Sequence, residues 1–565
     1  MTDQASCPIC LKNLEEEDVV KIHQKGADGI NVASARRGDA IVVSAGCNVH
    51  SSCRKKYTNS INIDLHLKKK QECASNITKR SSRTLEGPFD NKTAIKVSPD
   101  RTIDCALLFQ RFIVVSKTGE LSLEDIMLYE LCPYPPALFE TSNLFRKADK
   151  PQLAQVISEY ANVGILDNMP ETECYVLDGG SLLHRVPWKR GETYATIAKS
   201  YADFTIKHYA KPMVIFDGYE CGPSIKDNVH QRRGYDIHPI VSFTCDTEFN
   251  GKKEEFLSRT VNKQQLINLI TVEMKKRGTS VLNALGDADV EIVKAAVENS
   301  RHHTTTLIGE DTDLLILLLH YANLNDKDLY FRSDKFKSEK CAKVFHINKI
   351  KEILGNDICT QLLFIHAMTG CDSTSRIFGI SKKAVFLKLI KGDPTLQSIA
   401  KTFTSPNQSV DVIEGQGCHA MSVLFGGKIT DCLAKLRYKA FTKKVVSTSS
   451  FVTPERLPPT EDATKLHCRR VYYQVMVWMG TDDGLDATDW GWNQQGNHYI
   501  PIMSKMNAAP DRLLKVIHCN CSNACMTQRC SCRKYGLPCT PACGPCQVHS
   551  CDNPQNSILI EDYDD

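Results

Sequence analysis

TLIGEDTDLLILLLH, residues Thr306 to His320, is the stretch that decides the fold. It reads as a short apolar strand, a turn that carries Glu310, Asp311 and Asp313, and then a continuous apolar run. Two carboxylates spaced i, i+2 after a strand point to the same side of the chain. Because ligands of open α/β sheets bind at the carboxyl ends of the strands, we predict that this turn faces a functional site.

Four further aspartates precede this turn and one follows it. Two apolar segments, 175–177 and 213–216, each end in an aspartate, and other acidic positions lie in GDAD at 286–289 and TGCD at 369–372. Seven carboxylates gathered at one sheet edge would repel each other strongly unless hard cations lay between them. The pattern predicts a divalent-metal site that hydrolyses phosphodiesters. The candidate ligands are Asp178, Asp217, Asp287, Asp289, Asp311, Asp313 and Asp372.

Strands and helices alternate between residues 172 and 400. The stretch Lys263 to Arg277, KQQLINLITVEMKKR, places Leu266, Leu269, Ile270 and Met274 on one face of a helix. Such alternation predicts a mostly parallel sheet that is covered by helices on both faces. We therefore expect a multidomain chain with a central α/β sheet and a small zinc module at each end.

Composition limits the class of protein. The chain has 565 residues, 42% hydrophobic and 24% charged, with a net charge of only +4. It is therefore no polycation, and any nucleic-acid surface must be local. No apolar segment opens the sequence and no run of 18 apolar residues interrupts it, so we expect a protein that is neither secreted nor membrane-bound. With 25 cysteines and no secretion signal, short Cys spacings predict zinc thiolates rather than disulfides.

The N-terminal residues carry one candidate zinc site. Cys7 and Cys10 form one CxxC pair, and His50 and Cys53 form a second pair about 40 residues later. These four residues could close one tetrahedral Zn²⁺ site, with Cys47 as the alternative fourth ligand. The competing interpretation is two unrelated cysteine pairs in a small core.

The C-terminal residues carry a denser cysteine cluster, with nine cysteines in 33 residues. Three separate four-cysteine sites need twelve thiolates, so nine suffice for about three Zn²⁺ ions only if three of them bridge. Five nearby basic side chains, Arg512, Lys515, Arg529, Arg533 and Lys534, predict DNA contact; a metal-stapled module that binds protein is the alternative. The cysteines are Cys519, Cys521, Cys525, Cys530, Cys532, Cys539, Cys543, Cys546 and Cys551. This spacing resembles the CXC domain of tesmin-type chromatin proteins.

Five motifs of the central region, in their order along the chain, resemble those of the flap endonuclease and XPG-type nucleases, which have a PIN-like fold. The resemblance covers about 230 residues. VLDGG and VIFDG are similar to the family's first two aspartate strands, and GEDTD resembles its acidic turn. DAD stands where the family carries Glu-x-Glu, so each carboxylate is one methylene shorter. The motifs are VLDGG at 176–180, VIFDG at 214–218, DAD at 287–289, GEDTD at 309–313 and FIHAMTGCDSTSRIFGISKKAV at 364–385.

The resemblance implies the cofactors and the roles of individual residues. The seven aspartates would hold two Mg²⁺ or Mn²⁺ ions. Lys226 and Arg233 would polarise the scissile phosphate, although a solvated basic face is the competing interpretation. Backbone amides near Gly379, a region that also carries Lys382 and Lys383, would bind the phosphates of duplex DNA.

These inferences predict a divalent-metal-dependent endonuclease that acts on structured or chromatin-associated DNA, with RNA as the alternative substrate. We expect a nuclear protein, or otherwise a cytoplasmic one, whose zinc modules serve targeting. The alternative is an inactive DNA- or chromatin-binding scaffold, for which a mobile element is one conceivable origin. In the segment 466–515, Trp478, Trp490 and Trp492 are expected to pack a small core. The expected domains are 1–70 (zinc module), 71–170 (linker and helical segment), 171–400 (nuclease-like), 401–465 (helical tail and linker), 466–515, 516–552 (CXC) and 553–565 (acidic tail).

Overall fold

The structure is a computed structural model with two compact units, Met1–Asn91 and Lys92–Asp565. It describes residues 7, 9, 19–37, 41, 43–58, 94–98, 101–104, 123–209, 212–218, 223–226, 239–334, 343–447, 454–496, 498–509, 518–521, 525–534, 537, 539, 543, 546, 551 and 553.

The described residues of the smaller unit form a two-stranded sheet and two helices. Its strands pair antiparallel, and Ile22, Ile30 and Val49 lie in its small apolar core. The elements are β1 (Val19–Lys21), α1 (Gln24–Arg37), β2 (Asn48–His50) and α2 (Ser51–Thr58).

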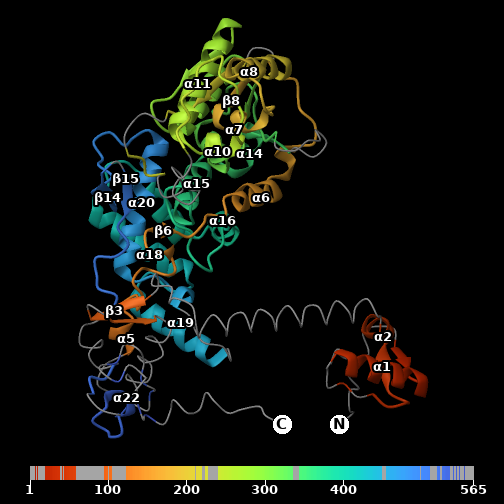
Figure 1. Cartoon of the computed structure of the whole chain (residues 1–565), viewed down its shortest axis with the longest axis vertical. Helices are drawn as coiled ribbons and strands as arrows, with labels where there is room; N and C mark the ends of the chain where they lie inside the picture. The colour runs from red at the N-terminus through yellow and green to blue at the C-terminus, as the bar shows by residue number, and fades with distance from the viewer. Residues whose placement is uncertain are drawn as a thin grey trace. The chain divides into compact units, whose positions relative to one another are not determined.

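The larger unit contains a seven-stranded sheet, of which Figure 1 labels β8 (Cys174–Asp178). Strands β10, β9, β8, β11 and β12 are neighbours in this order and run parallel. Strand β13 pairs antiparallel with β12, and β7 pairs antiparallel with β13. The predicted mostly parallel α/β sheet is therefore confirmed. Across the sheet the order is β10 (Ser280–Asn283), β9 (Met213–Phe216), β8 (Cys174–Asp178), β11 (Thr305–Ile308), β12 (Leu329–Arg332), β13 (Val344–His346) and β7 (Ile165–Leu166).

The order of the strands reverses between β8 and β11. From β8 the chain continues outward through β9 to β10, and from β11 it continues in the opposite direction to β12. The carboxyl ends of two neighbouring strands that lead in opposite directions leave a crevice, which is the usual ligand position in open α/β sheets.

Helices cover both faces of the sheet. Successive side chains of a strand point to opposite faces, so each strand contributes apolar residues to both. Val176 and Leu307 belong to the apolar cluster that contains residues of α12, α13 and α15. Leu177 and Ile308 belong to the cluster on the other face, with residues of α7, α8 and α11; α8 and α11 lie side by side in Figure 1. The helices that flank the sheet are α6 (Pro151–Tyr160), α7 (Gly179–Arg185), α8 (Tyr194–Tyr209), α10 (Lys253–Leu257), α11 (Thr260–Lys276), α12 (Asp289–Ser300), α13 (Thr312–Tyr321), α14 (Ile347–Leu354) and α15 (Asn356–Met368).

A helical region follows the sheet and shares its apolar core. The cluster of α12, α13 and α15 continues through the later helices as far as Trp492. Trp478, Trp490 and Trp492 are all buried, which confirms that they pack in a core. The domain boundaries proposed at residues 401 and 466 remain predictions. The apolar cluster contains residues on both sides of each boundary. The later elements are α16 (Lys382–Ile390), α17 (Pro394–Phe403), α18 (Val410–Leu424), α19 (Leu433–Ser447), η4 (Pro454–Arg456), α20 (Glu461–Met479), β14 (Trp492–Gln495), β15 (His498–Pro501) and α22 (Ser531–Lys534).

The segment 71–170, predicted to hold a linker and helices, also contains short strands. Helices α5 and α6 form there, but residues 139–145 form an antiparallel hairpin, and residues 101–104 form a strand. None of the helices in the described part of the chain is long and apolar enough to cross a membrane. The elements before the sheet are β3 (Ala94–Ser98), β4 (Arg101–Asp104), α5 (Leu123–Ile126), β5 (Phe139–Thr141), β6 (Leu144–Phe145) and η2 (Asn162–Gly164).

Candidate metal centre

Adjacent parallel strands bring Asp178 and Asp217 to one sheet edge. Asp178 ends β8 and also begins α7, where its Oδ1 accepts a hydrogen bond from the backbone N–H of Ser181 at 3.2 Å. Asp217 follows β9, and its Oδ1 accepts one from the backbone N–H of Ala288 at 3.1 Å. A Cβ added at Gly180 would lie 3.1 Å from Asp178 Oδ1 and 3.4 Å from Asp217 Oδ2. Both carboxylates therefore border one small space beside this glycine.

A second group of carboxylates surrounds the ammonium group of Lys150. Asp311 begins α13, Asp313 lies in its first turn, and Asp372 follows α15. We call these three residues the Asp311 cluster. Lys150 Nζ lies 2.8 Å from Asp311 Oδ2, 3.1 Å from Asp313 Oδ2 and 2.9 Å from Asp372 Oδ2. The three aspartates each offer one oxygen within 4.8 Å of the others, which is the arrangement that a metal ion requires.

A third group lies around Lys226, whose Nζ is 2.7 Å from Asp287 Oδ2 and 2.7 Å from Asp289 Oδ2. Burial opposes the charge of Lys226, but Asp287 and Asp289, and then Asp372 and Asp313, outweigh it and hold its pKa well above the usual value. Since Asp372 and Asp313 belong to the Asp311 cluster, the two groups form parts of one site. We call the seven aspartates together the acidic centre.

Two successive buried hydrogen bonds connect Asp313 to His366 and His366 to Lys382. His366 Nε2 lies 2.6 Å from Asp313 Oδ1, and its Nδ1 lies 3.1 Å from Lys382 Nζ. Burial, followed by the charge of Lys382, lowers the pKa of His366, so the imidazole is neutral. A neutral ring has one donor and one acceptor, so Nε2–H donates to Asp313 and Nδ1 accepts from Lys382. This chain fixes the orientation of the Asp313 carboxylate.

The acidic centre has more negative than positive charge. Burial, and then the neighbouring Asp217, raise the pKa of Asp178 to about 6. Burial also raises the pKa of Asp289 and Asp311, with Asp287 and Asp313 respectively as the next largest causes. Only near Asp313 do Lys150 and His366 outweigh burial, so that the pKa of this carboxyl lies well below its usual value. Crowded buried carboxylates of this kind are stabilised by hard cations.

The residues present fit a divalent metal ion. Every candidate ligand is a carboxylate, the donor that Mg²⁺ and Mn²⁺ prefer, and the described acidic centre has no cysteine or histidine in ligand position. Two ammonium groups, those of Lys150 and Lys226, offset only part of the charge of seven carboxylates. The chemistry of the donor set therefore matches the divalent ions that the sequence predicted.

The structure describes only some of the predicted basic residues. Lys226 lies in a turn, and Arg233 lies outside the described residues. Lys382 lies in the region whose backbone amides we expect to bind DNA phosphates, and its side chain is buried against His366 and Thr369. Lys383 forms an ion pair with Glu159 at 2.7 Å. The side chain of Lys382 therefore supports the site from within and cannot contact DNA.

Sequence reasoning missed Lys150 and His366. Lys150 precedes Pro151 at the start of α6, in a segment that carries no motif, and it reaches Asp311 across 161 positions of the chain. His366 stands alone among apolar residues of α15, a pattern typical of an ordinary core position. Its signal in the sequence was its place in the motif at 364–385, six residues before Asp372.

The structure brings three of the four predicted N-terminal zinc ligands together. Ligand atoms of Cys7, His50 and Cys53 lie within 4.8 Å of one another. Cys10 lies outside the described residues, and Cys47 does not belong to the group. A zinc site with Cys10 as fourth ligand remains a prediction.

The nine C-terminal cysteines also gather in one place. Seven are buried, and the partly buried Cys521 and Cys551 pack against them. Three groups of four could each hold a metal ion; Cys519 belongs to all three, whereas Cys525 and Cys539 each belong to two. Shared cysteines are what a cluster with bridging thiolates requires. The three cysteine groups are Cys519, Cys532, Cys539 and Cys543; Cys519, Cys521, Cys525 and Cys530; and Cys519, Cys525, Cys539 and Cys546.

Of the predicted DNA-contacting residues, Arg529, Arg533 and Lys534 are described, and Arg512 and Lys515 lie outside the described residues.

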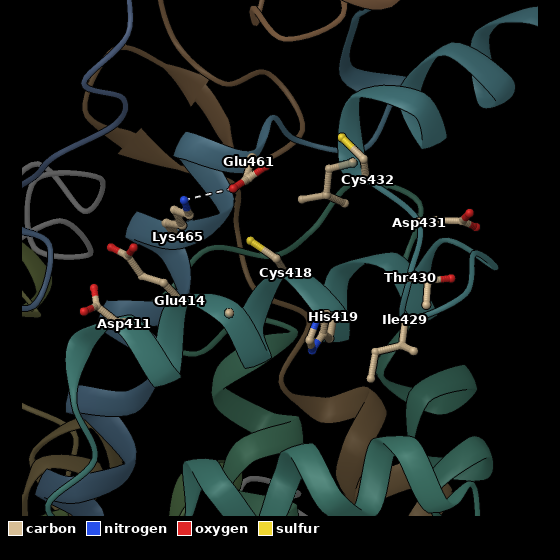
Figure 2. Close-up of a pocket in the computed structure, with 12 residues that line it drawn as sticks. Asp411, Glu414, Cys418, His419, Ile429, Thr430, Asp431, Cys432, Glu461 and Lys465 are labelled. Atoms are coloured by element: carbon tan, nitrogen blue, oxygen red, sulfur yellow. Dashed lines mark ion pairs between the residues drawn. The ribbon is translucent and has the colours of Figure 1, made fainter.

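A pocket of about 550 Å³ lies elsewhere, between α18, the start of α19 and α20 (Figure 2). Cys418 and His419 line it, and Glu461 forms an ion pair there with Lys465 at 2.9 Å. None of the seven aspartates of the acidic centre lines this pocket, so it is separate from the candidate metal centre.

Solved nuclease structures are among the proteins that resemble this chain, and three of them serve as examples. The catalytic core of Rad2 in complex with a DNA substrate is 12% identical, with a TM-score of 0.27 over 43% of this chain and 76% of that one. A bacteriophage T5 flap endonuclease pseudo-enzyme–product complex with DNA and metal ions is 14% identical, with a TM-score of 0.29 over 56% and 95%. A T5 5′-exonuclease mutant is 15% identical, with a TM-score of 0.27 over 56% and 93%. No protein-family model and no curated protein matches the sequence. The assignment to the α/β class rests on the strand order and register of the sheet.

Proposed function

We propose that this chain is a divalent-metal-dependent nuclease that acts on DNA. The observation that carries the proposal is the Asp311 cluster, whose three carboxylates offer oxygens within 4.8 Å of one another. The cluster lies at the carboxyl ends of the parallel strands, beside Asp178, in the crevice where ligands of such sheets bind.

In this proposal the aspartates hold two Mg²⁺ or Mn²⁺ ions. Bound ions of this kind activate a water molecule and stabilise the leaving oxygen of an in-line displacement. The Asp313 carboxylate is held in one orientation by His366, which in turn is held by Lys382. Lys226 supplies a cation at the edge of the centre, beside Asp287 and Asp289, where the phosphate of a substrate would need a counter-charge.

The zinc modules would deliver the nuclease to DNA or chromatin in the nucleus. Around α22, Arg529, Arg533 and Lys534 supply basic side chains for phosphate contacts. We propose one Zn²⁺ ion at the N-terminal site and about three in the C-terminal cluster. RNA is the alternative substrate.

The test is cleavage of labelled flap, bubble and single-stranded DNA, and of single-stranded RNA, in Mg²⁺ and in Mn²⁺. The double variant Asp311→Asn/Asp313→Asn should lose more than the roughly 10–100-fold in activity that changes in outer-shell residues cause. Asp483→Asn is the matched control, since Asp483 is exposed and lies outside the acidic centre. The ranking of the substrates would identify the class of nuclease.

One observation favours a second candidate function, a DNA- or chromatin-binding scaffold. Lys150 and Lys226 place ammonium groups among the carboxylates that would hold metal ions, and these groups neutralise part of the charge without any ion. A folded wild-type protein that binds DNA but cleaves none of the substrates in either metal would rule out the nuclease and favour the scaffold.

A further inference from the structure

The Asp311 cluster has an internal cation that comes from a distant part of the chain. We propose that Lys150 is a resident counterion of the Asp311 cluster, which a divalent metal ion must displace before the site is loaded. The inference rests on the proposed function and concerns how that site is regulated. It makes metal loading a competition between an ion from solution and an ammonium group of the protein itself.

The geometry places the ammonium group of Lys150 at the centre of the cluster. Its Nζ lies within 3.1 Å of one oxygen of each aspartate, and it also donates to Asp311 Oδ1 at 3.0 Å. The Asp311, Asp313 and Asp372 oxygens that it contacts belong to the same carboxylates that form the candidate metal group. A metal ion and this ammonium group would therefore need the same space.

The charges of the cluster favour a divalent ion over the ammonium group. Three carboxylates around one ammonium leave two negative charges without compensation at close range, whereas one divalent ion leaves only one. Burial strengthens this difference, because charges interact more strongly away from water. Asp313 is 1% exposed and Lys150 13%, so water screens little of the interaction.

The backbone that carries Lys150 is held in place, so displacement needs only a movement of its side chain. Helix α6 is fixed to α16 at three points: Lys383 Nζ pairs with Glu159 at 2.7 Å, the Lys383 backbone N–H donates to Gln152 at 3.2 Å, and Tyr160 packs edge-on against Phe386. The four-carbon stem of Lys150 can then rotate about its own bonds while α6 stays docked.

The competition predicts that removal of the charge tightens metal binding. Lys150→Met keeps most of the length of the stem and removes the ammonium group. We expect full-length Lys150→Met to bind Mn²⁺ about tenfold more tightly than the wild type, as a typical coupling between two competing ligands. Isothermal titration calorimetry and the electron paramagnetic resonance of free Mn²⁺ measure this affinity without any cleavage assay.

Three variants control the experiment. Lys150→Arg keeps the positive charge and should bind Mn²⁺ as weakly as the wild type. Lys147→Met removes an exposed lysine of the same segment and should not change the affinity. In an Asp311→Asn/Asp313→Asn background, Lys150→Met should no longer tighten binding, because the site for which it competes is gone.

A second measurement covers the case in which Lys150→Met folds poorly. In metal-free buffer the variant leaves the carboxylates without their counterion, so its melting temperature should fall below that of the wild type. Added Mn²⁺ should restore it, and the Mn²⁺-induced rise should exceed that of the wild type.

The outcomes separate this inference from the proposed function. Equal Mn²⁺ affinity in the wild type and in Lys150→Met, or weaker binding by the variant, overturns the role of Lys150 and leaves the metal site intact. If neither protein binds Mn²⁺, both the inference and the proposed nuclease fail.

Discussion

Lys382 provides the sharpest test of the buried chain that supports Asp313. Its ammonium group is buried and donates to His366 Nδ1, to the backbone carbonyl of His366 and to Thr369 Oγ1. Burial lowers its pKa from 10.5 to about 7. Between these two pH values the unfolded chain binds a proton that the folded protein has lost, so stability should rise with pH. Lys382→Met removes this proton and with it this part of the pH dependence.

The size of the effect follows from the pKa of Lys382. A difference of one pKa unit corresponds to about 1.4 kcal/mol. In the folded protein Lys382, with a pKa of about 7, is half deprotonated at pH 7 and almost wholly deprotonated at pH 9. Integration over this range gives about 2 kcal/mol of stability that the wild type gains and Lys382→Met does not. The other titrating groups are present in both proteins, so the difference reports on Lys382 together with His366, whose pKa the charge of Lys382 lowers.

Urea unfolding of both proteins at pH 7, 8 and 9, followed by tryptophan fluorescence, measures this difference. Trp478 stacks on His366 with 5.6 Å between the ring centres, so the signal reports on the same region. Lys349→Met, at a partly exposed ion pair with Glu352, is the control and should follow the wild type. Parallel pH profiles for the wild type and Lys382→Met would refute the reasoning and show that Lys382 stays charged in the folded protein.

Two other predictions concern packing and zinc. A Cβ at Gly179 would lie 2.3 Å from the ring of Phe216, whereas one at Gly286 would meet nothing within 4 Å. Gly179→Ala should therefore lower the free energy of unfolding in urea by up to about 3 kcal/mol, and Gly286→Ala should lower it by less than about 1 kcal/mol. Cys519 belongs to all three candidate four-cysteine groups and Cys551 to none, so Cys519→Ser should lose more zinc than Cys551→Ser in elemental analysis; equal losses would contradict the shared role of Cys519.

Periodicity and strand-end positions explain what the sequence could predict. The sheet was predictable because short apolar runs such as 213–216 end in acidic residues, and parallel strands align such ends at one edge. The face of α11 was predictable from the spacing of Leu266, Ile270 and Met274, all of which are buried. Both features depend on local order, which a sequence shows directly.

The contacts that complete the site depend on tertiary packing, which the sequence does not show. Lys150 reaches Asp311 because α6 packs against both α13 and α16, and no local pattern encodes these contacts. The buried position of the Lys382 side chain was missed for a related reason: the first turn of α16 directs it into the core, and that depends on how α16 packs. The hairpin at residues 139–145 was missed because strands of two or three residues have too few positions to show alternation.

The raised pKa of Asp178 indicates that its charged carboxylate destabilises the metal-free fold. Its pKa of about 6, against the usual 3.8, means that its ionised form is disfavoured in the fold at neutral pH by up to about 3 kcal/mol. Asp178→Asn removes the charge, and its side-chain oxygen can still accept the hydrogen bond from Ser181. In metal-free buffer at pH 7.5 the variant should therefore melt at a higher temperature than the wild type, while Asp483→Asn should not. The same variant should bind Mn²⁺ more weakly, because it loses a charged ligand. If Asp178→Asn lowers the melting temperature without metal, the carboxylate is already compensated within the protein, and the excess negative charge would no longer support a divalent-metal site.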